Sequence, residues 1–95
     1  MATFTVTTSK HATLTLNTVD TVNVRANAVE VLNRSTTTTD MVWFTVDGTN
    51  PTVAGDNTYL ATPGIPVQVP ADYDGLANVK LISATATPYS VTAVG

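Results

Sequence analysis

The feature that most constrains the fold is a strict alternation of apolar and polar residues. Apolar side chains occupy every second position in eight short segments: Phe4 and Val6; Leu14 and Leu16; Val22 and Val24; Val29 and Val31; Val42, Phe44 and Val46; Val67 and Val69; Val79 and Leu81; Tyr89, Val91 and Ala93. Because successive side chains of a strand point to opposite faces, this period predicts strands with one face in a core. No window combines helical spacing with capping residues, so negligible helix is predicted.

Turn signals separate these segments at short, regular intervals. They stand at Ser9–Lys10, Asn17–Thr18, Thr36–Thr39, Asp47–Gly48, Gly55–Asn57, Pro63–Gly64 and Asp72–Gly75. About one residue in five is threonine, which suits a pleated surface that meets water. The pattern predicts an all-β sandwich of seven to nine short antiparallel strands, or a small barrel. A chain of 95 residues forms one domain, residues 1–95.

The segment VWFTVDGTNPTV, Val42–Val53, joins an apolar strand to turn residues. Gly48 after Asp47 can take a positive φ without a Cβ clash, and Pro51 cannot donate to a strand ladder. The strand should therefore end near Val46. A structured loop should then carry the chain to a strand beginning at Tyr59, at another position in the sandwich.

Charge and composition argue against several classes of protein. The net charge is −3 and only 12% of residues are charged, so no basic patch is available for nucleic acid. No apolar run approaches the length needed to cross a bilayer, and Met1–Phe4 lacks the start of a signal peptide. Without cysteine there is neither a disulfide nor a thiolate metal site. We expect no enzyme activity, cofactor, nucleic-acid partner or membrane partner.

The residues that could carry chemistry are few. His11 is the single histidine and is predicted at a turn between two threonine-rich strands, with no partner set for metal binding or nucleophilic catalysis. Asp72–Gly75 looks like a fragment of a calcium loop, and Asp47 and Asp56 could lie near it. The twelve-position calcium pattern is absent, however, so solvated turns with capping aspartates are favoured. No catalytic, cofactor or metal residue is predicted.

Trp43 is the residue best placed to contact a partner. It points away from Val42 and Phe44, which are expected to face the core. Burial in the protein or between subunits is favoured, and stacking on a sugar is the alternative.

The remaining polar signals have structural interpretations. Asn33–Ser35 fits the glycosylation sequon, but use of the sequon needs a secretory route. Arg25, Glu30 and Arg34 have two interpretations: they pair across strands, which contributes little at an exposed site, or they lie at a partner interface, where they matter more.

Half of the chain carries a family resemblance. The segments Val42–Thr52, Tyr59, Ile65–Val67 and Val79–Ala84 resemble an immunoglobulin-like sandwich module found at the C-terminus of chitobiase-type enzymes and in bacterial surface proteins. The pattern shared is an aromatic strand, Asp-Gly-Thr-x-Pro-Thr, a tyrosine, an apolar strand and a Lys-containing strand. The resemblance covers residues 41–84 and implies an immunoglobulin-like fold, with Asp47, Gly48 and Pro51 as structural turn residues.

The chain as a whole also resembles small structural proteins of tailed bacteriophages. The segments WFTVDGTNPTVAGDNTYL and VKLISATATPYSVTAVG, in a short threonine- and valine-rich chain, carry this resemblance. It implies a non-enzymatic virion accessory protein, such as a capsid decoration or tail-associated protein. The major capsid protein or another virion protein would be its partner, and it would form a homo-oligomer and assemble in the host cytoplasm. The alternative is an immunoglobulin-like module that binds carbohydrate or a cell surface.

Overall fold

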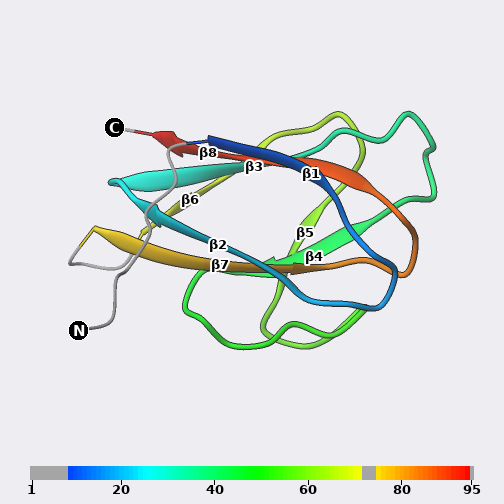
Figure 1. The fold of residues 1–95 in the computed structure, drawn as a ribbon, viewed down its shortest axis with the longest axis horizontal. Coiled ribbons are helices and arrows are strands. Elements are labelled where there is room, and N and C mark those ends of the chain that lie inside the picture. The colour runs from blue at the N-terminus through cyan, green and yellow to red at the C-terminus, as the bar shows by residue number, and fades with distance from the viewer. Residues whose placement is uncertain (1–8, 72–74, 95) are drawn as a thin grey trace.

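The protein is a sandwich of two four-stranded antiparallel sheets, seen in a computed structural model that describes residues 9–71 and 75–94 (Figure 1). The first sheet has the order β1 (Ser9–Thr13), β8 (Pro88–Val94), β3 (Ala28–Asn33) and β6 (Val67–Pro70). The second has the order β2 (Asp20–Arg25), β7 (Leu76–Ile82), β4 (Val42–Thr45) and β5 (Tyr59–Ala61). No helix occurs in these ranges, so none is available to span a membrane. The predicted all-β sandwich of seven to nine strands is confirmed.

The connections between the strands define a jelly roll. Apart from β4 and β5, every two consecutive strands lie in opposite sheets. The resulting orders, 1-8-3-6 facing 2-7-4-5, are those of an eight-stranded double-sheet jelly roll. In the immunoglobulin arrangement the first two strands share a sheet, whereas β1 and β2 face each other here. Alternation along single strands is the same in both arrangements, so the sequence pattern cannot distinguish them.

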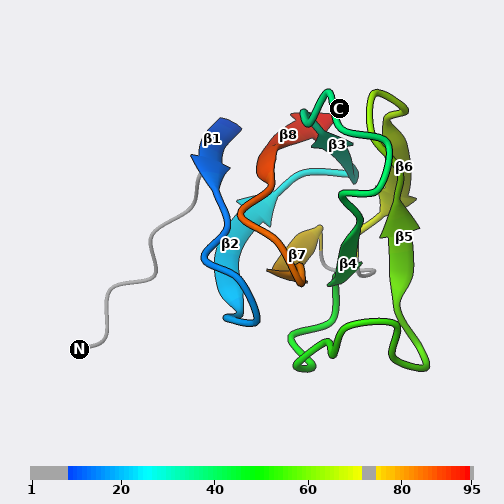
Figure 2. The same cartoon turned by 90° about the vertical axis from the view of Figure 1, so that its right-hand side faces the viewer.

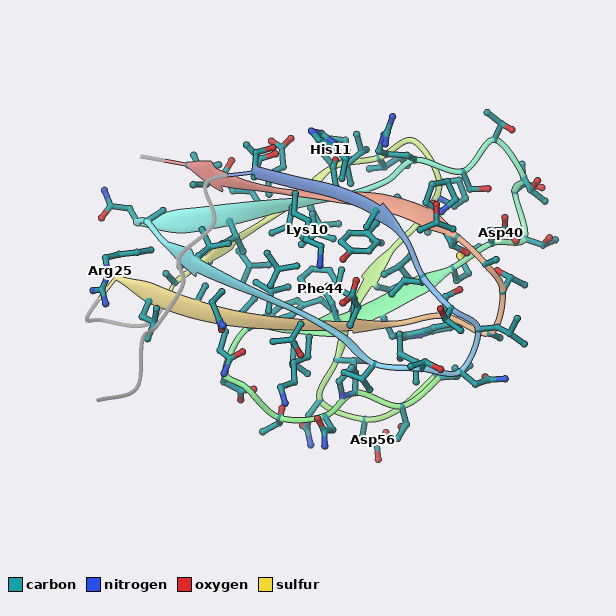
Figure 3. All side chains as sticks on the ribbon, viewed as in Figure 1. Lys10, His11, Arg25, Asp40, Phe44 and Asp56 are labelled. Atoms are coloured by element: carbon teal, nitrogen blue, oxygen red, sulfur yellow. The ribbon has the colours of Figure 1, made fainter. Side chains whose placement is uncertain are left out.

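The core consists of the alternating side chains identified in the sequence. Twelve of them form one buried cluster together with Ala61 and Ala77: Leu14, Val22, Val24, Val29, Val31, Val42, Phe44, Val69, Val79, Leu81, Tyr89 and Val91. Phe44 lies between the two sheets in Figure 3. Full burial of a valine, leucine or phenylalanine side chain contributes about 1.5–3 kcal/mol, so this cluster dominates the stability.

The β1–β2 side of the sandwich is closed by Asp20. Its carboxylate accepts a hydrogen bond from the hydroxyl of Tyr89 on β8, and Lys10 Nζ on β1 lies 3.6 Å from Oδ2. The sequence prediction of a turn at Ser9–Lys10 and His11 is wrong, because these residues form β1 and pair with β8. An edge strand tolerates the inward-facing Lys10 because the ammonium group reaches Asp20 at the rim.

One end of the sandwich is organised by Asn33, which is fully buried at the end of β3. Its Nδ2 donates to the carbonyls of Asp40 (2.8 Å) and Ala61 (3.0 Å), and its Oδ1 accepts from the amide of Ser35 (3.0 Å). The Asn33–Ser35 sequon is therefore closed to glycosylation in the folded protein, since both amide hydrogens are used inside. Thr36–Thr39 form an exposed loop above it, as the turn signal there predicted.

The loop between β4 and β5, residues 46–58, folds back over the outer face of the second sheet (Figure 1). Lys80 Nζ on β7 donates to Asn50 Oδ1 at 3.1 Å, and Thr45 Oγ1 donates to the Thr49 carbonyl at 2.6 Å. Pro51, within this loop, is buried. The loop returns the chain to the same sheet, because β5 pairs directly with β4. The expectation that it carries the chain to another position in the sandwich is thus wrong.

Candidate functional site

A cleft of about 520 Å³ opens where the β4–β5 loop meets the edge of the sandwich. Thr45, Val46 and Asp47 line it from the end of β4 and the residues that follow, and Asn57, Thr58 and Tyr59 line it from the end of the loop and the start of β5. Pro70, at the end of β6 in the opposite sheet, completes it. The cleft therefore collects residues from both sheets, and its volume lies within the range of small-molecule sites.

Tyr59 provides the aromatic surface of the cleft. It pairs in register with Phe44 of β4, and the two rings are stacked with centroids 5.3 Å apart and planes inclined by 28°. Phe44 is fully buried, whereas Tyr59 is 45% exposed. One side of the tyrosine ring is therefore held by the core while the residue as a whole remains open to solvent.

Asp47 provides the charge of the cleft. Its Oδ1 accepts hydrogen bonds from Thr49 Oγ1 at 2.6 Å and from the Thr49 amide at 3.1 Å. These bonds stabilise the carboxylate, so they hold the pKa of Asp47 below its usual value. Gly48 follows with φ of 83°, and its amide donates to the carbonyl of Asn78 at 3.1 Å. The Asp47–Gly48 turn thus fixes the carboxylate at the mouth of the cleft.

The opposite wall is shaped by a second turn. Asn57 has a positive φ of 60°, a conformation that asparagine tolerates better than most residues. Thr58 Oγ1 donates to the carbonyl of Gly55 at 2.8 Å, which closes the turn. The Asn57 side chain is exposed beside Tyr59 and is not used by the turn.

A second surface runs along the same side of the sandwich, where β5 and β6 are the edge strands (Figure 2). We call it the β5–β6 edge, residues 60–69, a stretch without a charged residue. Leu60 is 46% exposed on β5, and Ile65 is 61% exposed in the connection to β6. Exposed apolar side chains gathered in an uncharged segment are typical of a protein contact.

Trp43 lies beside this edge rather than in the cleft. Its register partners on the outer face of the second sheet are Leu60 on β5 and Ile82 on β7. Trp43 is half-buried, Ile82 is buried and Leu60 is exposed. The tryptophan therefore links the covered part of this face to the exposed Leu60, and it is not the open platform that sugar stacking requires.

The other residues singled out in the sequence do not converge. His11 is exposed on β1, with Nε2 3.3 Å from Ser9 Oγ and with Ser90 directly opposite on β8. Within the described ranges, no group of three or more histidine, aspartate or glutamate side chains could hold a metal ion. Asp72–Asp74 of the calcium-like segment lie outside those ranges.

The cross-strand ion pairs expected of Arg25, Glu30 and Arg34 are not formed with any residue of the described ranges. Glu30 lies opposite Thr92 and Gln68 in the first sheet, so its neighbours in register are uncharged. Arg25 and Arg34 are exposed.

Sequence reasoning missed the cleft because it treated Tyr59 only as the start of a strand, and Asp47–Gly48 and Gly55–Asn57 only as turns. The pairing of Tyr59 with Phe44 depends on how the loop of residues 46–58 folds back, which no local pattern encodes. The turn residues at both ends of that loop were the available signal. Comparison of the chain with protein-family models, curated proteins and solved structures found no match.

Proposed function

We propose that this chain is a non-enzymatic accessory protein of a tailed-bacteriophage virion, and most specifically a capsid decoration protein. The resemblance of its segments to small phage structural proteins supports the proposal. The jelly-roll order of its strands adds support by analogy, since this architecture recurs in viral capsid proteins and also in other classes.

The observation that carries the proposal is the β5–β6 edge. Leu60 and Ile65 project there from a stretch without charged residues, at a side of the sandwich where both sheets end. Such an edge can bury apolar area against a partner without the cost of desolvating charges. Repetition over a lattice of identical subunits then gives high avidity from a weak single contact.

The partner in this proposal is the major capsid protein or another virion structural protein. The chain joins the particle during assembly in the host cytoplasm and forms a symmetric homo-oligomer at its binding position. Its role is mechanical, because it adds contacts that hold neighbouring subunits together.

The proposal is tested by sedimentation of the purified protein with particles of the source phage assembled without it. We expect saturable binding, with Leu60→Asp and Ile65→Asp each weakening it about tenfold or more, since a charge would be buried in the contact. Leu16→Asp is the matched control, because Leu16 is 54% exposed in the β1–β2 loop, away from the edge. Absence of binding by the wild-type protein, or equal loss with Leu16→Asp, would contradict the proposal.

A further inference from the structure

We propose that the cleft between the β4–β5 loop and β6 binds a neutral pyranose sugar, with the ring stacked on Tyr59. This inference is independent of the virion proposal, because it concerns a different surface. The β5–β6 edge is uncharged and exposes Leu60 and Ile65, whereas the cleft combines one aromatic ring with a carboxylate, an amide and hydroxyl groups. A pyranose has an apolar face of C–H groups and a rim of hydroxyls, so it matches both parts.

The aromatic part of the site is preorganised. Phe44 supports the ring of Tyr59 from the core, and the two residues are paired in register on neighbouring strands. The ring therefore loses little conformational freedom when a ligand covers it, which is a main cost of binding to exposed side chains. Pro70 stands on the other side of the cleft as a rigid apolar wall.

The polar part of the site has unused hydrogen-bonding capacity. Asp47 uses Oδ1 for both bonds to Thr49, which leaves Oδ2 to accept from a ligand hydroxyl. Asn57 offers an amide donor and an acceptor from the facing turn, and its side chain makes no hydrogen bond within the described part of the chain. Vicinal hydroxyls of a sugar can therefore be held from two directions while the ring lies on Tyr59.

The charge of the cleft selects the class of sugar. Asp47 is an anion at neutral pH, as aspartates ordinarily are, and its bonds to Thr49 hold its pKa lower still; no lysine or arginine lines the cleft. Asp56, which precedes Asn57 in the chain, adds a second exposed carboxylate in the same loop; Figure 3 labels Asp56. Uronic acids, sialic acids and phosphorylated sugars are thus disfavoured relative to neutral hexoses.

The inference also places the sugar contact elsewhere than at the tryptophan for which the sequence left sugar stacking as the alternative. The tryptophan considered there, Trp43, is half-buried on the outer face of the second sheet and is absent from the cleft lining. Tyr59 occupies the position that an aromatic platform needs, beside convergent polar groups.

The test is a titration of the isotope-labelled protein with cellobiose and with lactose, followed by amide chemical shifts. We expect saturable shifts confined to residues 45–49 and 57–59, with glucuronic acid giving weaker binding than either neutral disaccharide. Tyr59→Ala and Asp47→Asn should each weaken binding about tenfold or more, whereas Tyr59→Phe should retain it. Leu60→Ala is the matched control, because Leu60 is as exposed as Tyr59 but faces the other side of β5.

If Tyr59→Ala fails to fold, the location of the shifts in the wild-type protein and the effect of Asp47→Asn decide the matter. Shifts that never saturate, shifts spread over the β5–β6 edge, or equal effects of Leu60→Ala and Asp47→Asn would overturn the inference. Because the titration uses free protein, its failure would leave binding to particles unaffected.

Discussion

The hydroxyl of Tyr89 on β8 donates a hydrogen bond to the carboxylate of Asp20 on β2, which joins the two sheets at the β1–β2 side. The same carboxylate accepts from the Thr21 amide at 3.0 Å and lies 3.6 Å from Lys10 Nζ. Because Lys10 and Asp20 are each about a third exposed, their ion pair contributes at most about 1 kcal/mol. The Tyr89–Asp20 bond is the stronger link, since Tyr89 is buried.

The first prediction concerns this link. Tyr89→Phe should lower the free energy of unfolding by about 1–3 kcal/mol, because it removes a hydrogen bond to a charged acceptor and leaves Asp20 less well satisfied. Urea unfolding measures the change. Tyr59→Phe serves as the control, because its hydroxyl makes no hydrogen bond within the described residues and should change stability little. Equal effects of the two variants would show that the Asp20 contact does not stabilise the fold.

The second prediction concerns alkaline pH. Burial and the neighbouring Asp20 raise the pKa of Tyr89 above its ordinary value. The protonated hydroxyl of Tyr89 therefore contributes its full stabilisation below the pKa of an unfolded tyrosine, about 10. Above that pH the contribution is lost progressively, because the tyrosine of the unfolded chain loses its proton first. The urea midpoint of the wild-type protein should fall between about pH 9 and 11, and less steeply in Tyr89→Phe. If the urea midpoints of the two proteins fell in parallel with pH, Tyr89 would not be the group responsible.

The third prediction concerns the Asp47–Gly48 turn. Gly48 and Gly64 both have positive φ, 83° and 78°. A Cβ at Gly48 would lie 2.9 Å from Asn78 Nδ2, whereas a Cβ at Gly64 would meet nothing within 4 Å. Gly48→Ala should therefore cost about 1–3 kcal/mol and more than Gly64→Ala, which carries the backbone strain alone. Melting temperatures that fall equally in both variants would mean that the contact with Asn78 relaxes freely.

The fourth prediction concerns Asn33. Asn33→Ala should destabilise the protein by about 2–4 kcal/mol, because the carbonyls of Asp40 and Ala61 and the amide of Ser35 lose their partner in a buried site. Asn27→Ala is the control, because Asn27 is exposed between β2 and β3 and, among the described residues, only its backbone carbonyl is engaged, by the Ala71 amide. Denaturant unfolding should separate the two variants clearly, and similar midpoints would refute the role given to Asn33.

Local sequence patterns predicted the inward faces of the strands but not their partners. Val29 and Val31 on β3, and Tyr89 and Val91 on β8, face the core as their alternation requires. The strand β1 was missed because Lys10 and His11 lack an apolar alternation, and the pairing with β8 that orders them joins segments far apart in the chain. The jelly-roll order depends on the same long-range pairings.

The cleft was beyond prediction for a related reason. Its residues were visible as turn and aromatic positions, but their convergence requires the register of Phe44 with Tyr59 and the approach of Pro70 from the other sheet. Both are consequences of tertiary packing rather than of local propensity. The alternation along its strand predicted only that Trp43 points away from the core. The fold of the loop of residues 46–58 leaves Tyr59 as the exposed aromatic ring.

The most direct test of the proposed function is to measure the amount of this chain in purified particles of the source phage. Quantitative mass spectrometry would give its ratio to the major capsid protein, before and after a high-salt wash. An assembly role predicts a constant ratio set by the symmetry of the shell, retained at high salt because the β5–β6 edge is uncharged. Particles that are complete and carry none of the chain would contradict the account.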